Sequence, residues 1–155
     1  MDAGVIPQII ILVILLMLSA FFSSAETSLT TVNKIRIRTL AEDGDKRAKR
    51  VLDITSNSGK MLSAILIGNN IVNLSASSIA TSLAIKLWGS VAAGIATGIL
   101  TILILIFGEI SPKTLATIYS EKISLLYSAP ISFLIKVLTP VIFIINKLSL
   151  GFLML

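Results

Sequence analysis

Long apolar stretches alternate with short polar segments along this chain. The residues from Val5 to about Phe22 are almost wholly aliphatic, and two further apolar stretches follow the polar segment that ends at Lys60. A helix needs about 20 apolar residues to cross the hydrocarbon core of a bilayer. We therefore predict three transmembrane helices, over about 5–32, 61–86 and 90–112. A cleaved signal peptide is the alternative for the first stretch, but the N-terminal residues Met1–Gly4 include none of the basic residues that such peptides carry.

The segment between the first two predicted spans is rich in basic residues. Eight of the 13 lysines and arginines lie between Lys34 and Lys60. Basic loops face the cytoplasm, so this segment, about 33–60, should be cytoplasmic, with the N-terminus outside. Its apolar residues recur at helical spacing on either side of Gly44, which predicts an amphipathic helical hairpin at the membrane surface. The third span then returns to the cytoplasm.

The last part of the chain, about 113–155, is apolar but interrupted. Two prolines and two lysines divide it, namely Pro130, Lys136, Pro140 and Lys147. The segment is long enough for a fourth span, but these residues favour short juxtamembrane helices whose lysines reach the interface. The expected fold is thus an all-α integral membrane domain over residues 1–155: three transmembrane helices, a cytoplasmic hairpin and C-terminal juxtamembrane helices.

Composition restricts the chemistry. Hydrophobic residues make up 55% of the chain and charged residues only 14%, against about 25% charged in soluble domains. Histidine and cysteine are absent, which excludes imidazole catalysis, disulfides and zinc sites of the usual kind, so bound metal must be held by oxygen. No serine lies beside a plausible base, so we do not expect an enzyme. The net charge of +5 does not indicate nucleic acid, because the basic segment contains no aromatic residue for stacking.

Three oxygen-bearing side chains share one face of the first predicted span. Ser19, Ser23 and Glu26 are separated by four and then three residues. Serines in such helices usually serve close packing or bond to the preceding turn. A carboxylate near the hydrocarbon is costly unless it is paired, solvated or protonated. Glu26 therefore favours a functional face, although it would also be accommodated at the level of the lipid headgroups.

Three amides lie within five residues of the second predicted span: Asn69, Asn70 and Asn73. Asn69 and Asn73 are one helical turn apart and share a face. Amides in membrane helices can hold helices together by mutual hydrogen bonds. Amide oxygens are also good neutral ligands for a hard cation, so both interpretations stay open.

The third predicted span ends in a glycine, a carboxylate and a proline. Pro112 cannot donate a hydrogen bond to the carbonyl of Gly108, four residues earlier, so a kink there would leave that carbonyl unpaired beside Glu109. Discontinuous membrane helices commonly build cation sites in this way. The alternative is an ordinary proline kink with an ion pair between Glu109 and Lys113.

Together these positions offer hydroxyl, amide, carbonyl and carboxylate oxygens from three helices. The candidate ligands are Ser19, Ser23, Asn69, Gly108 and Glu109. Six oxygens suit Mg²⁺ in octahedral geometry, although Mg²⁺ usually keeps several waters. Na⁺ would be satisfied by the same oxygens with less charge.

Three sequence motifs resemble a known family. They are SAFFSSAET at residues 19–27, GNNIVN at residues 68–73 and FGEISPK at residues 107–113. In this order they resemble the transmembrane domain shared by the CorC bacterial magnesium transporters and the animal cyclin M (CNNM) proteins. The resemblance covers essentially the whole chain, and the three motifs are specific jointly rather than singly.

The resemblance implies a homodimer in the cell membrane that exports Mg²⁺, coupled to Na⁺, by alternating access. The ion would be held without its water shell by the five candidate ligands given above. Residues of second rank, for sodium or for bracing the helices, would be Glu26, Asn70, Asn73 and Pro112. The full-length proteins would also carry cytoplasmic CBS domains that bind ATP, which lie outside these 155 residues. A different class of function also stays open, a membrane anchor or assembly module whose polar residues only pack helices.

Overall fold

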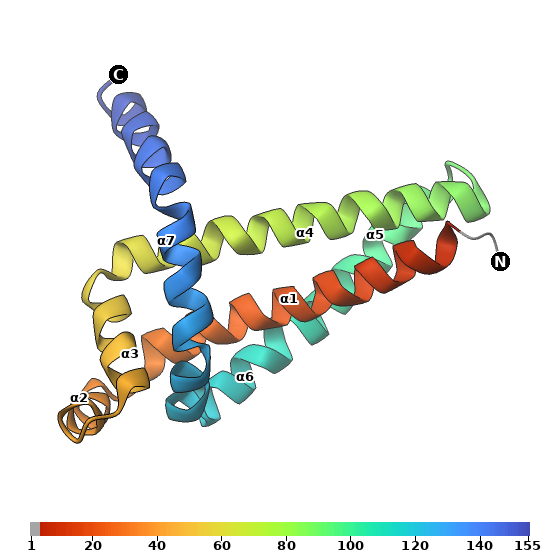
Figure 1. Cartoon of the computed structure of the whole chain (residues 1–155). Coiled ribbons are helices and arrows are strands. Elements are labelled where there is room, and N and C mark those ends of the chain that lie inside the picture. Colours follow the sequence, from red (N-terminus) through yellow and green to blue (C-terminus); the bar gives the residue numbers. More distant parts are fainter. Residues whose placement is uncertain (1–3) are drawn as a thin grey trace. The chain divides into compact units, whose positions relative to one another are not determined.

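The computed structural model of the chain describes residues 4–155, and every regular element in that range is a helix (Figure 1). Residues 1–3, on which the argument against a signal peptide largely rests, lie outside the described residues. The elements in order are α1 (Val5–Thr31), α2 (Lys34–Glu42), α3 (Lys46–Ser56), α4 (Ser58–Trp88), α5 (Ala92–Leu103), η1 (Ile104–Ile110), α6 (Ser111–Ile118) and α7 (Ser120–Leu153). The expected all-α class is confirmed for the described part of the chain.

Four helical segments are long and apolar enough to cross a membrane. They are α1, α4, the continuous run Ala92–Ile118 and α7. In their most apolar windows only 6% to 28% of the residues are buried inside the chain. Such apolar exposure is expected of helices whose solvent is lipid. The first three segments occupy the regions of the predicted spans, α7 adds a fourth of sufficient length, and the count of three spans stays a prediction.

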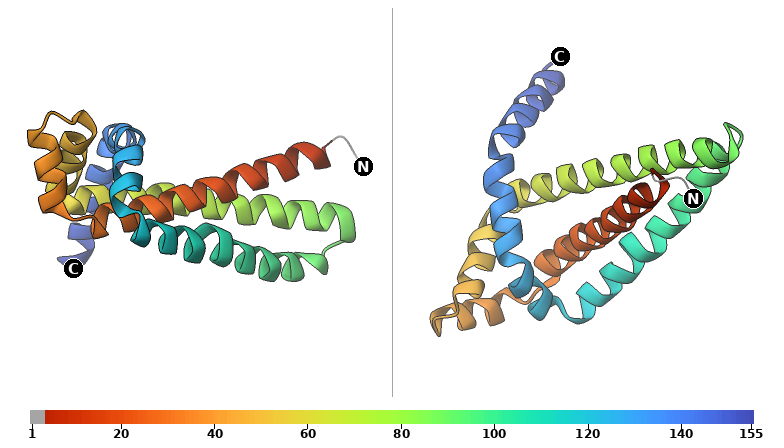
Figure 2. Two further views of the ribbon diagram at one scale, coloured as in Figure 1. Left: turned by 90° about the horizontal axis from the view of Figure 1, so that it is seen from below. Right: turned by 45° about the vertical axis from the view of Figure 1, so that its right-hand side comes forward.

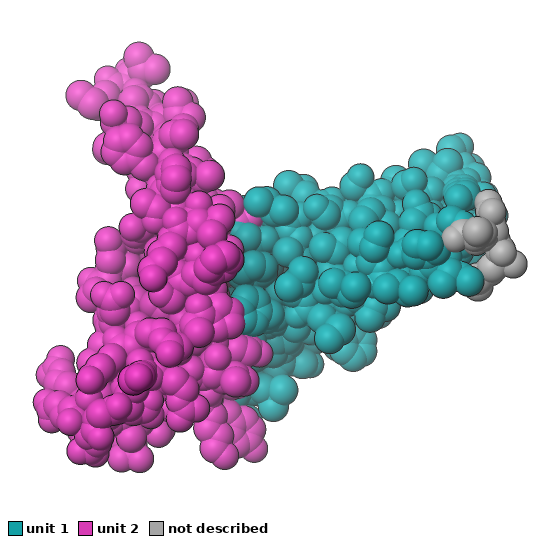
Figure 3. Space-filling model, in the orientation of Figure 1, with its two compact units in different colours: residues 1–24, 68–118 teal, residues 25–67, 119–155 magenta. Residues whose placement is uncertain are grey.

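The chain divides into two compact units, which Figure 3 colours separately. Unit 1 comprises residues 1–24 and 68–118, and unit 2 comprises residues 25–67 and 119–155. Within unit 1, the first part of α1, the second part of α4 and the run α5–η1–α6 lie side by side, as both views of Figure 2 show. Gly89, at a φ of +88°, forms the turn between α4 and α5, where a left-handed backbone favours glycine.

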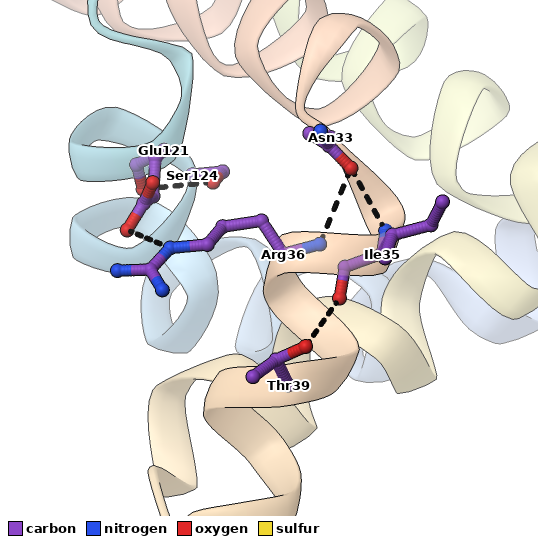
Figure 4. A network of polar contacts seen from close by, with 6 residues as sticks. All are labelled: Asn33, Ile35, Arg36, Thr39, Glu121 and Ser124. Atoms are coloured by element: carbon purple, nitrogen blue, oxygen red, sulfur yellow. Dashed lines mark hydrogen bonds and ion pairs between the residues drawn. The ribbon is translucent and has the colours of Figure 1, made fainter.

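Unit 2 is built around α3, which packs against both α2 and α7. Asn33 caps α2, because its Oδ1 accepts hydrogen bonds from the N–H groups of Ile35 and Arg36 at 3.0 and 3.2 Å. Arg36 Nε also lies 3.6 Å from Glu121 Oε1 and so connects α2 to the first turn of α7 (Figure 4). These contacts hold the two short helices of residues 34–56 on α7.

The turn between α2 and α3 is made by a glycine and an aspartate. Gly44 has a φ of +97°, and Asp45 caps α3 by accepting hydrogen bonds from Arg47 and Ala48. Desolvation of the Asp45 carboxyl acts to raise its pKa, but these two N–H donors and the Arg47 charge outweigh it and lower the pKa. The two short helices expected on either side of Gly44 are therefore present, and their position at a membrane surface stays a prediction.

α7 differs from the expected short juxtamembrane helices. It is a single helix of 34 residues that continues through Pro130 and Pro140. Each proline removes one donor, but the other backbone groups of an apolar helix have no better partner than the helix itself. The expectation that these prolines divide the segment into short helices was therefore wrong.

Candidate functional site

Hydroxyl groups on α1 fall into two classes. Ser24 and Thr30 donate to carbonyls of the preceding turn, Ser24 to Ala20 at 2.7 Å and Thr30 to Glu26 at 2.8 Å. Ser19 and Ser23 are each only 1% exposed, yet neither Oγ has a hydrogen-bond partner within the described chain. The ordinary explanation of a membrane-helix serine, a bond to its own helix, does not apply to these two residues.

Ser19 lies directly against the backbone of Gly108. A Cβ atom added to Gly108 would be 2.8 Å from Ser19 Oγ and 3.3 Å from Ser19 Cβ. Real Cβ atoms essentially never come within 3.0 Å of another atom, so only glycine fits here without movement. The structure thus brings together two of the predicted ligands, a hydroxyl on α1 and the glycine of the third predicted span.

A second glycine, Gly68, lies against the side chain of Phe22, which is about one turn beyond Ser19 on α1. A Cβ on Gly68, in α4, would be 2.6 Å from the ring of Phe22. The ring of Phe21 meets that of Phe22 edge-on, with centroids 5.2 Å apart. Within unit 1, α1 therefore contacts both motif glycines, Gly108 through Ser19 and Gly68 through Phe22. Each glycine is followed directly by a predicted ligand, Asn69 or Glu109.

The asparagines of α4 divide between a buried and an exposed position. The Oδ1 atoms of Asn69 and Asn73 are buried and accept no hydrogen bond within the described chain. The mutual hydrogen bonds of a purely structural amide pair are thus absent at these oxygens. Asn70 is exposed. Asn73 was predicted only as a residue of second rank, but its buried oxygen without a partner makes it a candidate ligand equal to Asn69.

Gly108 and Glu109 lie in η1, a segment wound as a π-helix. At its end the N–H of Ser111 bonds to the carbonyl of Ile106, five residues earlier rather than four. Such wide turns are rare and occur frequently at functional sites. The expected proline kink in an ordinary α-helix is therefore corrected: the chain winds as a π-helix up to Ile110, and Pro112 lies buried just beyond it in α6.

Glu109 is the only acidic residue among the described residues of unit 1. Its side chain is half-buried, and it forms no ion pair with Lys113 within residues 4–155, so the alternative of a simple ion pair is not realised. Glu26 lies in unit 2, half-buried, and is not among the residues of unit 1 described above.

One further oxygen of this kind was not predicted. Gln8 Oε1, on α1, is buried and has no hydrogen-bond partner within residues 4–155. Gln8 precedes Ser19 by 11 residues, which places it on the same face of the helix but about 16 Å further along the axis. It therefore belongs to another level of the helix than Ser19. An isolated amide in an aliphatic helix was the available signal.

Four candidate ligands in unit 1 share one property: a buried oxygen without a partner. They are Ser19, Ser23, Asn69 and Asn73. An unsatisfied buried polar atom costs about 1–3 kcal/mol, so each of these oxygens calls for an occupant such as water or a cation. Neutral hydroxyl and amide oxygens, together with a carboxylate such as that of Glu109, are the kinds of ligand that suit a hard cation.

The helices and these oxygens define a class, an integral membrane domain whose apolar helices carry buried polar side chains without partners in residues 4–155. The chain matches the cyclin M transmembrane N-terminal domain over residues 10–155, and it belongs to that family. The family expected from the three motifs is confirmed.

Individual relatives give the same assignment. The chain is 45% identical over 137 residues to a UPF0053 protein of Haemophilus influenzae, covering 88% of this chain and 33% of that protein. It is 38% identical over 136 residues to the UPF0053 inner membrane protein YfjD of Escherichia coli, covering 85% and 31% respectively. A polyamine export protein of Escherichia coli is 25% identical over 168 residues, covering 92% and 35%. The chain thus spans about a third of the length of these relatives.

Proposed function

We propose that this domain transports Mg²⁺ across the cell membrane and that the buried oxygens of unit 1 bind the ion on its way. The carrying observation is that Ser19 and Ser23 are buried without partners although Ser24, on the same helix, is satisfied by its own backbone. Hydroxyls used only for packing would bond back in the same way. Oxygens left without a partner are ready to replace the water of a dehydrated cation.

The proposed ligands of the ion are Ser19, Ser23, Asn69, Gly108 and Glu109, with Asn73 added on the strength of its buried oxygen. Glu109 supplies the negative charge and the others supply neutral oxygens. A site with one carboxylate and otherwise neutral ligands holds a divalent cation less tightly than a cage of several carboxylates, which suits release during transport.

Alternating access coupled to Na⁺ is the proposed mechanism. The wide turn of η1 supports it, because a π-helical segment can return to α-helical winding by shifting its hydrogen bonds by one residue. Such a shift would move Glu109 relative to the serines of α1 and so open or close the site. We further propose a homodimer in the inner membrane, with the N-terminus outside and the basic segment 34–60 in the cytoplasm.

Thermal stabilisation by Mg²⁺ tests the site. For the wild-type chain in lipid nanodiscs, we expect the melting temperature to rise with MgCl₂, because a ligand that binds only the folded state adds about 2.7 kcal/mol at 100 times its Kd. Ser23→Ala and Glu109→Gln should lose most of this rise. Ser24→Ala is the matched control and should keep it, because its hydroxyl is bonded to Ala20.

Two outcomes decide between the candidate classes. If Ser23→Ala and Glu109→Gln keep the full effect of Mg²⁺, the site assignment is wrong and the anchor or assembly module is favoured. The relative named as a polyamine export protein suggests a second cargo. If spermidine stabilises the chain at lower concentration than Mg²⁺, and through the same residues, an organic polycation is the cargo instead.

A further inference from the structure

Unit 2 contains a cavity that the transport site does not use. It has a volume of about 310 Å³ and lies between the α3–α4 junction and the middle of α7. Its lining residues are Asp53, Ile54, Ser56, Asn57, Lys60, Met61, Ser132, Ile135, Lys136 and Thr139. Seven of these ten residues are polar or charged, in a chain whose composition is mainly apolar.

The charges in this cavity are unbalanced. Lys60 and Lys136 line it from α4 and α7, against Asp53 as the only acid among the lining residues. Neither lysine forms an ion pair with any residue in 4–155. Two lysines without ion pairs give the lining of this cavity a net positive charge, which attracts an anion.

Uncharged donors accompany the lysines. Asn57 Oδ1 accepts a hydrogen bond from the backbone N–H of Lys60 at 3.1 Å, which leaves the amide NH₂ of Asn57 to donate elsewhere. The hydroxyls of Ser56 and Thr139 are occupied with backbone carbonyls, whereas Ser132 is free of such a bond. Two ammonium groups, an amide and a hydroxyl form a set of donors suited to a phosphate group.

A second cavity continues from the first. It has a volume of about 410 Å³ and shares Asn57, Lys60 and Thr139 with its neighbour. Its wall also includes Ile142 and Phe143 of α7, and Lys147 Nζ lies 4.7 Å from the centre of the Phe143 ring. The other lining residues of the second cavity are mostly polar, and its main apolar surface is the ring of Phe143, since Phe143 is 60% exposed and Ile142 only 4%. Both α4 and α7 are apolar enough to enter a membrane.

We propose that the cleft formed by these two cavities binds an anionic phospholipid, with its phosphate held by Lys60 and Lys136 and an acyl chain along the exposed ring of Phe143. A soluble phosphate would use the same donors, but it would leave the Phe143 ring uncovered. The lipid is favoured because the cleft offers both surfaces to one amphipathic ligand. The bound lipid would connect α3 and the start of α4 to α7.

A pair of double variants tests the proposal. Lys60→Gln/Lys136→Gln removes both lining lysines, and Lys49→Gln/Lys122→Gln removes the same charge from exposed positions of α3 and α7 that line neither cavity. We would titrate phosphatidylglycerol into the detergent-solubilised chain and measure retention by native mass spectrometry. The cavity variant should bind about 25-fold more weakly, about fivefold for each lysine, and the control variant should bind as the wild type does.

Further arms identify the ligand. Lys60→Arg/Lys136→Arg keeps the charges and should keep binding, which separates loss of the site from loss of folding. Phosphatidylcholine should bind weakly. Equal losses in the cavity and control variants, or no preference for phosphatidylglycerol over phosphatidylcholine, would overturn the proposal. Equally tight binding of inorganic phosphate, dependent on the same lysines, would replace the lipid by a soluble anion.

Discussion

The contact between Ser19 and Gly108 provides a direct test of the candidate site. In Gly108→Ala the new Cβ would lie 2.8 Å from Ser19 Oγ and 3.3 Å from Ser19 Cβ. Rotation of the hydroxyl relieves only the first contact, because the Ser19 Cβ is fixed to the backbone of α1. Either α1 or η1 must therefore move.

The cost follows from the size of that movement. Ordinary contacts begin at 3.4 Å, so the closely packed helices must shift by about 0.6 Å if the Ser19 hydroxyl stays in place, and by about 0.1 Å if it rotates away. Overpacking of this kind typically costs about 1–3 kcal/mol. The higher helix propensity of alanine stabilises the folded state by about 1 kcal/mol at most and offsets part of this cost. We expect Gly108→Ala to lower the free energy of unfolding by about 0–2 kcal/mol, the overpacking cost less the gain in helix propensity.

The control is a glycine in the same run of helix. Gly98, in α5, has nothing within 4 Å of an added Cβ, so Gly98→Ala should be neutral or slightly stabilising. Unfolding in a titration with sodium dodecyl sulfate, followed by circular dichroism, compares the two variants. If Gly108→Ala is as stable as Gly98→Ala, the close approach of α1 and η1 is wrong.

A rescue variant separates steric fit from ion binding. Ser19→Gly removes both atoms that crowd the new Cβ, and the nearest remaining neighbour is Ile104 Cγ2 at an ordinary 3.6 Å. Ser19→Gly/Gly108→Ala should recover most of the stability lost in Gly108→Ala, with a coupling energy of about 1–2 kcal/mol. It should nevertheless show a reduced Mg²⁺ effect, because the Ser19 oxygen is gone. Additive losses without rescue would refute the steric explanation.

Three further predictions concern other contacts. Gly68→Ala should destabilise the chain by about 1–3 kcal/mol, because its Cβ would meet the Phe22 ring at 2.6 Å, whereas Phe22→Leu in the same background should restore part of the loss in the unfolding titration. Asn33→Ala should cost about 1 kcal/mol through loss of the α2 cap, and Asn33→Asp should restore it; equal stability of both variants would contradict the cap. Because the pKa of Asp45 is lowered in the folded state, its carboxylate stabilises the fold at pH values above 3.8, the ordinary pKa of this group. This stabilisation should be lost as the pH falls through the lowered pKa. Asp45→Asn keeps a capping oxygen and should show a smaller pH dependence of melting in that range.

The sequence by itself determined the class of the protein and most of the helices. Apolar length predicts α1, α4 and the run α5–η1–α6, because a helix satisfies all its backbone hydrogen bonds locally and needs no distant partner in lipid. The turn at Gly44 was also predictable, since amphipathic spacing is a local property. The three motifs predicted the family, which the match over residues 10–155 confirms.

The candidate ligands could be named from the sequence but not ranked. Ser19, Ser23 and Ser24 cannot be distinguished in the sequence. Only the packed structure shows that the first two hydroxyls have no partner and that the third is bonded to its own helix. The structure likewise makes Asn73 as strong a candidate as Asn69, because both have a buried oxygen without a partner. Gln8 was not predicted at all. Whether a polar atom is satisfied depends on every neighbour around it, which no local pattern records.

Backbone winding was likewise decided by tertiary structure. Pro112 predicted a disturbance near Gly108, yet both an α-helical kink and a π-helical turn accommodate a proline there, and the structure has the π-helical turn. Pro130 and Pro140 are prolines too, but α7 continues through both. A proline removes one hydrogen bond wherever it occurs. The surrounding helices and their packing determine whether the chain kinks, widens or continues, which is why the sequence located these residues and only the fold decided their effect.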